Sequence, residues 1–453
     1  MNLFQIAWRN IRYRSLASLL TIISMALGVG LCVLVLSISG VLNTSLQRNS
    51  NVGYNLIVGS KGAATQLVFN TVFYLDKPIE NLPYDFYLEF LTAEQQNELV
   101  RKVTGESNPA LKGGRYAMFV AGGFAIPIAM GDYIEQFRLV STTPDYFEKL
   151  RYGEAAEHEY RFSAGRNFQE KSEEHGFFEA VVGSQVASAL NVGLGDKIYA
   201  SHGPGGLTHT DPFTIVGVLA PTGTPNDRAA FANLEGFFLL EGHVKPNRDD
   251  ETGIQLEEDP EELARIEAAE RLPLERREIT AVLVRTSPFG VNLDRAINKS
   301  PRAQAVSPIQ VITQLLELFV LPVQRLLLLL TLLVVLVSAI SILVSIYNSM
   351  NERTRDIAVM RALGASRDQV MLVIFGESLL ITLIGAVLGV LAGKGLATAL
   401  SPYVESYTGI RIPFFAINWP YEPMIIAGLI LLGTLAGLIP AIAAYRTNVA
   451  KHL

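Results

Sequence analysis

The stretch Leu326–Tyr347, "LLLLLTLLVVLVSAISILVSIY", decides the fold class of this chain. It is uncharged, and its 22 residues exceed the roughly 20 apolar residues with which a helix crosses a bilayer. Buried helices of soluble proteins can be as apolar as this one. Three further apolar stretches of at least this length, at 16–42, 370–400 and 423–445, make that explanation a poor one. Together the four stretches predict four transmembrane helices.

The first predicted span, residues 16–42, has two interpretations. Arg9, Arg12 and Arg14 precede it, as basic residues precede a secretory signal. Its apolar run is about twice as long as a signal core of 7–15 residues, and no small-x-small cleavage site stands out. We therefore expect a retained span. Residues 1–15 are amphipathic and predict a cytoplasmic elbow helix in contact with membrane lipid.

Basic residues are unevenly distributed around the predicted spans. They gather before the first span, between the second and the third, and after the fourth, whereas the loop 401–422 contains only Arg411. The positive-inside rule then places both termini and the segment 351–366 in the cytoplasm. The large middle, Arg48–Leu316, has 25 basic and 36 acidic residues, a net charge of −11 against +5 for the rest of the chain. This balance is typical of an exported soluble domain, and we expect no nucleic-acid partner.

The exported middle predicts an α+β domain of short elements. "FTIVGVLA", Phe213–Ala220, favours a strand through its β-branched residues, and Thr92 is placed to cap a helix in "TAEQQNELVRKV". The single cysteine, Cys32, lies inside the first predicted span, so the domain has no disulfide. At about 270 residues it is large enough to bury a core without one.

Two segments border this core. Residues 249–277 are strongly acidic and are expected to form a solvated insertion, with a partner-docking helix as the alternative. From Val306, apolar residues recur at helical spacing and predict a stalk that leads into the second span, interrupted near Pro322.

The predicted fold class is therefore an α+β integral membrane protein with four transmembrane helices and a large extracytoplasmic α+β domain between the first and second. The expected parts are an elbow helix 1–15, a first span 16–42, a core domain 43–305, a stalk 306–325, a second span 326–347, a cytoplasmic helix 351–366, a third span 370–400, an outer loop 401–422, a fourth span 423–445 and a tail 446–453.

Small residues recur every four positions in the predicted spans. Spacing of this kind lets helices approach closely in lipid, either within one chain or between two copies. The candidate packing residues are Gly385, Gly389, Gly393, Gly433 and Gly437. The spans lack the polar cluster expected along a solute pathway, apart from the acid Glu377. Glu377 is either paired with a neighbouring arginine or a functional latch in the membrane.

Catalytic motifs are scarce. The text around Gly389–Gly395 has the wrong spacing for a phosphate-binding loop and lies in a predicted span, so we expect that the chain is not an enzyme and holds no cofactor. In the predicted outer domain, "SHGPGGLTHTD" places His202, His209 and Asp211 on one glycine-rich loop. Such a loop could bind zinc or copper through His202 and His209, or the histidines could be simply solvated.

The charged segment Asn351–Val370, "NERTRDIAVMRALGASRDQV", is shaped as two helices around a turn. Asn351 can cap a first helix, and Gly364 is the residue type that ends one. Ser366 and Gln369 have the spacing of a capping box that opens the third span. The segment predicts a binding surface for a partner rather than a loose basic loop.

This segment resembles the coupling helix of MacB/FtsX-type ABC transporter permeases, which include LolC-like and LolE-like proteins. The matching residues are Glu352, Arg353, Thr354, Arg355, Asp356, Ile357, Ala358, Arg361, Ala362, Leu363, Gly364 and Ala365. Met360, which lies on the apolar side of the same helix, is a further residue expected to couple to the ATPase. "GRNF" (Gly165–Phe168), "VVGSQVASAL" (Val181–Leu190) and "GLGDKI" (Gly193–Ile198) are similar to the family's periplasmic core. Val449 departs from the family's ending, where a proline often stands.

The resemblance implies a permease in the bacterial inner membrane with a periplasmic outer domain. It implies a homodimer or a pair of related permeases, with two copies of a separate cytoplasmic ABC ATPase that binds ATP and Mg²⁺. In such a complex the spans transmit ATP-driven motion to the outer domain, for export or extraction of a hydrophobic, peptide or lipoprotein-like substrate. A periplasmic adaptor or substrate-binding protein is a further expected partner. The alternatives are an FtsX-like signalling permease that controls a cell-wall hydrolase, and a metal-linked transporter using His202 and His209.

Overall fold

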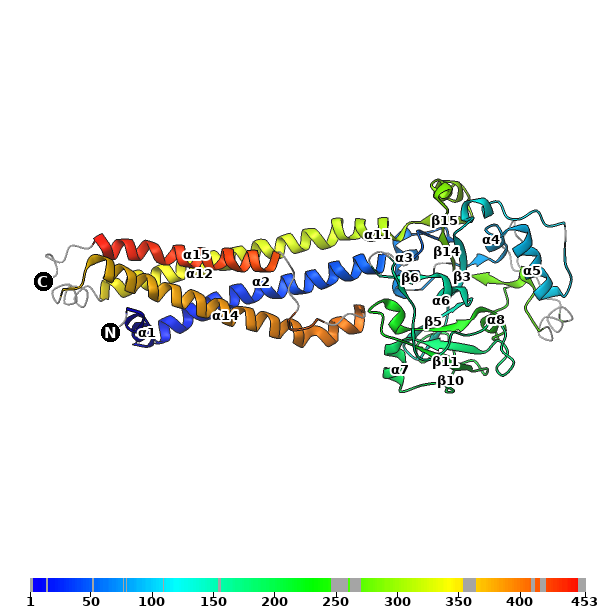
Figure 1. The fold of residues 1–453 in the computed structure, drawn as a ribbon, viewed down its shortest axis with the longest axis horizontal. Helices are drawn as coiled ribbons and strands as arrows, with labels where there is room; N and C mark the ends of the chain where they lie inside the picture. Colours follow the sequence, from blue (N-terminus) through cyan, green and yellow to red (C-terminus); the bar gives the residue numbers. More distant parts are fainter. Residues whose placement is uncertain are drawn as a thin grey trace. The chain divides into compact units, whose positions relative to one another are not determined.

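The computed structural model separates the chain into two compact units, shown in Figure 1. The helical unit contains Met1–Thr44 and Leu316–Leu453, and the sheet unit contains Ser45–Leu315. The residues that the structure describes are 3–13, 15–50, 53–75, 77–78, 80–108, 110–153, 156–245, 260, 270–352, 364–408, 412–415 and 421–446.

The helical unit is built from long helices that run side by side in Figure 1. They are α1 (Leu3–Tyr13), α2 (Ser15–Ser50), α12 (Leu321–Glu352), α14 (Arg367–Thr408) and α15 (Tyr421–Arg446), with a π-helical turn η5 (Leu316–Val320) before α12. Within the described residues, three stretches are long and apolar enough to cross a membrane: Ser18–Val41, Pro308–Val334 and Arg367–Val404. The predicted fourth span lies inside α15, and its crossing of the membrane stays a prediction.

Several helix boundaries differ from the sequence expectations. Helix α12 continues to Glu352, beyond the predicted end of the span at residue 347, so Asn351 lies within α12 rather than at the start of a new helix. Helix α2 continues to Ser50, beyond the predicted end of the span at residue 42, and α14 continues to Thr408 through Pro402, into the predicted loop. Hydropathy marks only the apolar part of a helix, whereas the helix itself continues as long as its backbone hydrogen bonds are made. A single proline removes only one backbone donor, so the helix can pass it at a local cost.

The predicted interruption near Pro322 takes the form of a π-helical turn rather than a break. Helix α11 (Pro308–Leu315) leads into η5, and α12 then begins at Leu321 with Pro322 as its second residue. Proline lacks an N–H group and its ring clashes with the carbonyl of the preceding helical turn, so a regular α-helical turn directly before it is disfavoured. The irregular turn therefore lies just before the proline.

The sheet unit is organised around one mixed sheet of 11 strands, in the order β10-β11-β9-β12-β5-β3-β14-β1-β15, with β4 paired to β5 and β8 to β11. The strands are β1 (Leu56–Ser60), β3 (Phe124–Ala129), β4 (Tyr133–Ile134), β5 (Phe137–Thr142), β8 (Phe162–Gly165), β9 (Glu179–Val182), β10 (Lys197–Ile198), β11 (Phe213–Leu219), β12 (Ala229–Asn233), β14 (Ala281–Arg285) and β15 (Ala303–Val306). Two short ribbons pair β2 (Leu82–Pro83) with β13 (Glu278–Ile279), and β6 (Arg151–Tyr152) with β7 (His158–Glu159). The predicted strand "FTIVGVL" is β11.

Short helices accompany the sheet. They are α3 (Ala64–Phe73), α4 (Asp85–Leu88), α5 (Ala93–Thr104), α6 (Asp145–Lys149), α7 (Ser184–Leu190), α8 (Leu234–Phe238) and α10 (Leu293–Asn298), with 3-10 turns at Ala117–Val120, Pro225–Arg228, Leu274–Arg276 and Pro288–Gly290. As predicted, Thr92 caps α5: its hydroxyl accepts from the Gln95 amide at 3.3 Å, and the Gln95 side chain accepts from the Thr92 amide at 2.9 Å. The two reciprocal bonds form a capping box.

The end of the acidic segment 249–277 is not solvated, contrary to the sequence expectation. Arg277 is fully buried, and its guanidinium donates two hydrogen bonds to Glu235, at 2.9 and 3.1 Å. The same group lies over the rings of Tyr84 and Phe238. Burying a charge is tolerated because the paired carboxylate and the ring faces replace its water. Residues 246–259 and 261–269 lie outside the described residues.

Candidate functional site

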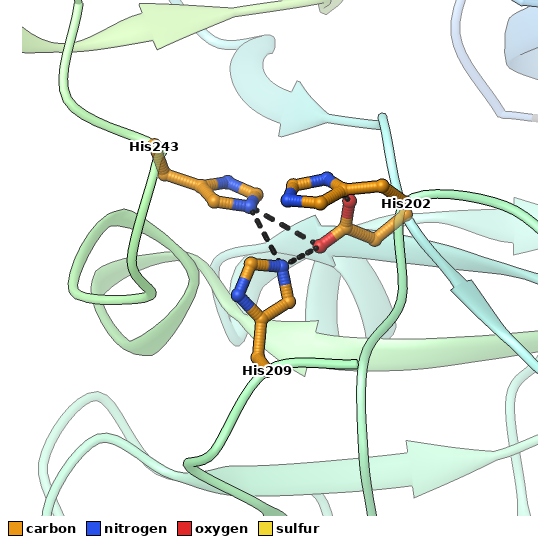
Figure 2. A group of neighbouring side chains, drawn as sticks. His202, His209 and His243 are labelled. Atoms are coloured by element: carbon orange, nitrogen blue, oxygen red, sulfur yellow. Dashed lines mark hydrogen bonds and ion pairs between the residues drawn. The ribbon is translucent and has the colours of Figure 1, made fainter. Parts of the chain in front are cut away.

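Four polar side chains from three loops of the sheet unit converge on one point, as Figure 2 shows for the three histidines. Asp132 lies in the turn between β3 and β4. His202 and His209 lie between β10 and β11, and His243 follows α8. The ligand atoms of all four residues lie within 4.8 Å of one another.

Backbone pairing brings the first three of these residues together. Tyr133 and Ser201 form an antiparallel bridge with both N–H···O distances at 2.9 Å, which sets Asp132 beside His202. The His209 amide then donates to the Ala200 carbonyl at 2.8 Å, so the loop folds back on itself. Gly203 and Gly205 form the turn with φ of +134° and +71°, a conformation that favours glycine.

The contacts are centred on the Asp132 carboxylate. Its Oδ2 lies 3.1 Å from His209 Nε2 and 3.2 Å from His243 Nε2, and these two nitrogens are 3.3 Å apart. Its Oδ1 lies 3.2 Å from His202 Nδ1. The His243 ring also packs edge-on against Phe237, with 4.2 Å between ring centroids. One carboxylate therefore contacts three imidazoles.

Burial differs across the cluster, and the pKa values of Asp132 and His209 are shifted from their ordinary values. Asp132 is 1% exposed and His209 is buried, whereas the His202 side chain is 52% exposed. Burial lowers the pKa of His209, against the opposing charge of Asp132. Burial by itself would raise the pKa of Asp132, but the hydrogen bond from His243 and the nearby imidazoles hold it below its ordinary value. The carboxylate is thus kept ionised inside the domain.

The sequence singled out only half of this cluster. His202 and His209 were predicted as a pair, with Asp211 as the acid beside them, but the structure places Asp132 at the centre and not Asp211. Asp132 and His243 lie 77 and 34 residues from His209 along the chain, so no local spacing relates them. Three imidazoles and one carboxylate are a donor set suited to zinc or copper.

The predicted packing glycines of α14 lie against α2. A Cβ atom on Gly385 would come within 2.8 Å of the Met25 Cβ. At Gly389 it would come within 2.7 Å of the Ala26 carbonyl oxygen, and at Gly393 within 2.6 Å of the Gly30 carbonyl oxygen. We call this contact, made by Gly385, Gly389 and Gly393 with Met25–Gly30, the glycine seam.

The remaining predicted packing and acid positions lie in α14 and α15. A Cβ on Gly437 of α15 would collide with Ser378 of α14, and the surroundings of Gly433 lie outside the description. Glu377 is buried in α14. The same unit contains a charged pair that the sequence did not reveal: the buried Lys394 Nζ is 2.7 Å from a Glu422 carboxylate oxygen.

Most of the predicted coupling helix lies outside the described residues. This applies to Arg353, Thr354, Arg355, Asp356, Ile357, Met360, Arg361 and Leu363. The flanks are described: α12 ends at Glu352, and Gly364 has a φ of +102°. The predicted capping box is present, because the Gln369 amide donates to the Ser366 hydroxyl at 3.2 Å and the Ser366 amide to the Gln369 side chain at 2.9 Å.

Comparison with known proteins identifies two family regions. Residues 18–273 match the MacB-like periplasmic core domain, and residues 328–449 match the FtsX-like permease C-terminal region. The uncharacterized ABC transporter permease YvrN of Bacillus subtilis (strain 168) is 35% identical over 101 residues, which is 22% of each protein. The macrolide export ATP-binding/permease protein MacB of Chlorobium luteolum is 40% identical over 55 residues, 12% of this chain and 8% of that protein.

The aligned segments cover about a fifth or less of these two relatives, so their whole-protein activities are not carried over. The match to the periplasmic core domain, by contrast, spans more than half of the 453 residues. The permease region follows it in the same chain, at residues 328–449. On these grounds this chain belongs to the MacB/FtsX-type family of ABC transporter permeases.

Proposed function

We propose that this chain transmits ATP-driven motion from a separate cytoplasmic ABC ATPase to its sheet unit, for export or extraction of a hydrophobic, peptide or lipoprotein-like substrate. Permeases of this family are embedded in the membrane, work with a cytoplasmic ABC ATPase and are not themselves catalytic. ATP and Mg²⁺ would then be bound by the partner. The proposal concerns how this chain takes up the partner's motion.

The continuity of α14 carries the proposal. The helix contains 42 residues and begins at Arg367, directly after the segment predicted to contact the ATPase. At 1.5 Å per residue its axis is roughly 63 Å long, enough to cross a bilayer and extend beyond it. The Ser366–Gln369 capping box defines its first turn. A displacement of the coupling segment would therefore act on one end of a single rigid element.

The close packing of the helical unit supports movement of its helices as one rigid body. At the glycine seam the backbones of α2 and α14 are so close that no side chain fits between them. The Lys394–Glu422 pair links α14 to the first turn of α15, and Lys394 Nζ is also 3.4 Å from the Ser37 hydroxyl of α2. Helices held by backbone contact and by a buried ion pair move as one body, because side-chain rearrangement cannot absorb the displacement.

The proposed arrangement in the cell follows from the charge distribution. Both termini and residues 351–366 face the cytoplasm, and the sheet unit faces the periplasm across the inner membrane. Two permease chains, identical or related, would pair with two ATPase copies, and a periplasmic adaptor or substrate-binding protein would engage the sheet unit. A reporter enzyme fused after Gly62 should report an exported location, and a cytoplasmic signal would contradict this topology.

Charge reversal in the coupling segment tests the proposal. The variant R353E/R355E/R361E should lose co-purification with the ATPase while its level in the membrane is unchanged. The matched control is R101E/R285E/R295E, which reverses three exposed arginines of the sheet unit. If the first variant keeps a normal complex and normal coupled ATP turnover, the coupling assignment is wrong.

The signalling alternative predicts a different result when cells carry the coupling variant R353E/R355E/R361E. Control of a cell-wall hydrolase would appear as loss of hydrolase activation in the coupling variant, with no substrate accumulating in the membrane. Transport or extraction would appear as substrate retained in the membrane, with hydrolase activity unchanged. The neighbouring genes would indicate which substrates and hydrolases to assay.

A further inference from the structure

The contacts among Asp132, His209 and His243 are more than a hydrogen-bond network can satisfy. Asp132 Oδ2, His209 Nε2 and His243 Nε2 form a triangle with sides of 3.1, 3.2 and 3.3 Å. Each ring nitrogen carries at most one hydrogen. If His209 Nε2 and His243 Nε2 both donate to Asp132 Oδ2, their two N–H groups face each other across the third side. If one of these nitrogens instead accepts from the other, it carries no hydrogen, and its lone pair faces the carboxylate oxygen. At most two of the three sides can therefore be hydrogen bonds.

A cation satisfies all three sides at once. Zinc binds imidazole nitrogen at about 2.0–2.1 Å and carboxylate oxygen at about 2.0–2.2 Å, almost always with tetrahedral geometry in closed sites. In a tetrahedron with bonds of about 2.0 Å, the ligand atoms are roughly 3.3 Å apart. The observed triangle has the size of one face of that tetrahedron.

His202 is the candidate for the remaining corner, because its ligand atom lies within 4.8 Å of those of the other three residues. It lies against the same carboxylate, with its Nδ1 at 3.2 Å from Asp132 Oδ1, and its side chain is 52% exposed. The other three residues are largely buried, with side-chain exposures of 1%, 5% and 8% for Asp132, His209 and His243. The cluster therefore has a buried three-residue base and one ligand at the solvent boundary (Figure 2).

We propose that Asp132, His202, His209 and His243 form an exchangeable Zn²⁺ site in the sheet unit. The donor set of three nitrogens and one oxygen suits Zn²⁺, and the tetrahedral spacing favours it over Cu²⁺, which takes square-planar or tetragonal geometry. The exposed His202 gives the ion a route to solvent, so the site loads and releases metal without unfolding of the domain. The ion joins the β3–β4 turn, the β10–β11 loop and the segment after α8.

The proposal does not rest on the coupling function. Zinc binding is measured on the permease alone, whereas the coupling proposal is measured by association with the ATPase. Either one can fail while the other holds.

The test uses the full chain in detergent, stripped with a chelator and titrated with Zn²⁺ alone. The wild type should bind one Zn²⁺ per chain, and X-ray absorption should show nitrogen and oxygen neighbours only. Zn²⁺ should raise the Tm of the sheet unit, because an ion that binds only the folded state stabilises it. His209→Ala and His243→Ala should lose stoichiometric binding, and His202→Ala should weaken binding at least tenfold while speeding the loss of metal to chelator.

The matched controls are His158→Ala and His175→Ala, which remove outer-domain histidines outside the cluster. Both should bind Zn²⁺ as the wild type does. Because His202 is exposed, its variant should fold even if His209→Ala does not, and the metal-free Tm of each variant reports on this. Absence of stoichiometric Zn²⁺, unchanged affinity in His202→Ala, or a sulfur neighbour would overturn the site. A square-planar spectrum with Cu²⁺ bound in preference to Zn²⁺ would overturn the choice of metal.

Discussion

The helical unit and the sheet unit achieve close packing in opposite ways. At the glycine seam, Gly385, Gly389 and Gly393 allow the α14 backbone to contact α2 by having no side chain. In the sheet unit, large rings fill the space instead: Phe147 packs against Phe231 with 5.0 Å between ring centroids, and other aromatic rings surround the pair. At the glycine seam the α14 backbone itself forms the contact surface, whereas the Phe147–Phe231 contact is made between side chains.

The solvent of each unit explains the difference. Lipid is as apolar as leucine, so apolar side chains gain nothing by leaving it, and helices associate through close van der Waals contact. In water, burial of apolar area drives packing, at about 25 cal/mol per Å², and large rings bury the most. Both units nevertheless contain a buried ion pair, Lys394–Glu422 in one and Arg277–Glu235 in the other.

Glu235→Ala should be the most damaging change in the sheet unit. It leaves the guanidinium of Arg277, which is fully buried, without its bidentate partner. Breaking a buried pair on one side costs about 3–5 kcal/mol. Hydrogen exchange of the β12 and β14 amides should report this loss. Glu98→Ala, which removes an exposed pair with Lys102, should cost less than about 1 kcal/mol, and equal effects would refute the distinction.

Lys394→Met should destabilise the helical unit by up to about 3 kcal/mol, the scale of an intramembrane charge. The substitution leaves Glu422 buried without the ammonium group 2.7 Å away. The double variant Lys394→Met/Glu422→Leu should recover most of the loss, because it removes both charges together. Thermal unfolding in detergent measures both. If the double variant does not regain thermal stability, Lys394 and Glu422 have a structural role besides neutralising each other's charge.

Gly389→Ile should cost about 1–3 kcal/mol through overpacking. Its new Cβ would lie 2.7 Å from both the Ala26 carbonyl oxygen and the Val29 Cβ. Gly395→Ile is the matched control on the same helix, because a Cβ at Gly395 meets no heavy atom within 4 Å. The same thermal assay should separate the two variants. Equal stability would mean that the glycine seam does not hold α2 and α14 together.

Removal of the helix caps should have the smallest effect and should not distinguish the units. Thr92→Ala in α5 and Ser366→Ala in α14 each remove one side-chain acceptor from a first-turn amide. Each substitution should cost about 1 kcal/mol, because in both helices it leaves the amide three residues after the cap without its side-chain acceptor. Faster hydrogen exchange confined to the first turns would support this. A change in only one helix would indicate that its cap is not formed in solution.

Local features of this molecule could be predicted from the sequence because their interactions are local. The Thr92 and Ser366 capping boxes each involve residues three positions apart, and "FTIVGVL" needs only its own β-branched residues to favour β11. The glycine spacing in α14 likewise predicted a close helix contact, though not whether its partner lies in the same chain. The structure shows the contact with α2.

Features that depend on distant residues could not be predicted. Arg277 sits at the end of an acidic, apparently solvated segment, and only the fold brings it to Glu235, 42 residues away. The cluster of one aspartate and three histidines is similar: His202 and His209 share a loop, but only the folded sheet brings Asp132 and His243 to them from other loops. No spacing rule marks them, because sheet pairing and not chain distance sets their separation.

The class of protein is evident from sequence patterns: apolar runs predict the membrane helices, charge predicts the orientation, and the coupling motif indicates the family. These patterns depend on composition and on residues close together along the chain, so they can be identified without knowledge of the fold. The fold, by contrast, sets which charges are buried together and which glycines contact which helix, and it brings three imidazoles to one carboxylate. Those contacts join residues that are far apart along the chain, and their energies exist only once the backbone has brought them within a few ångströms.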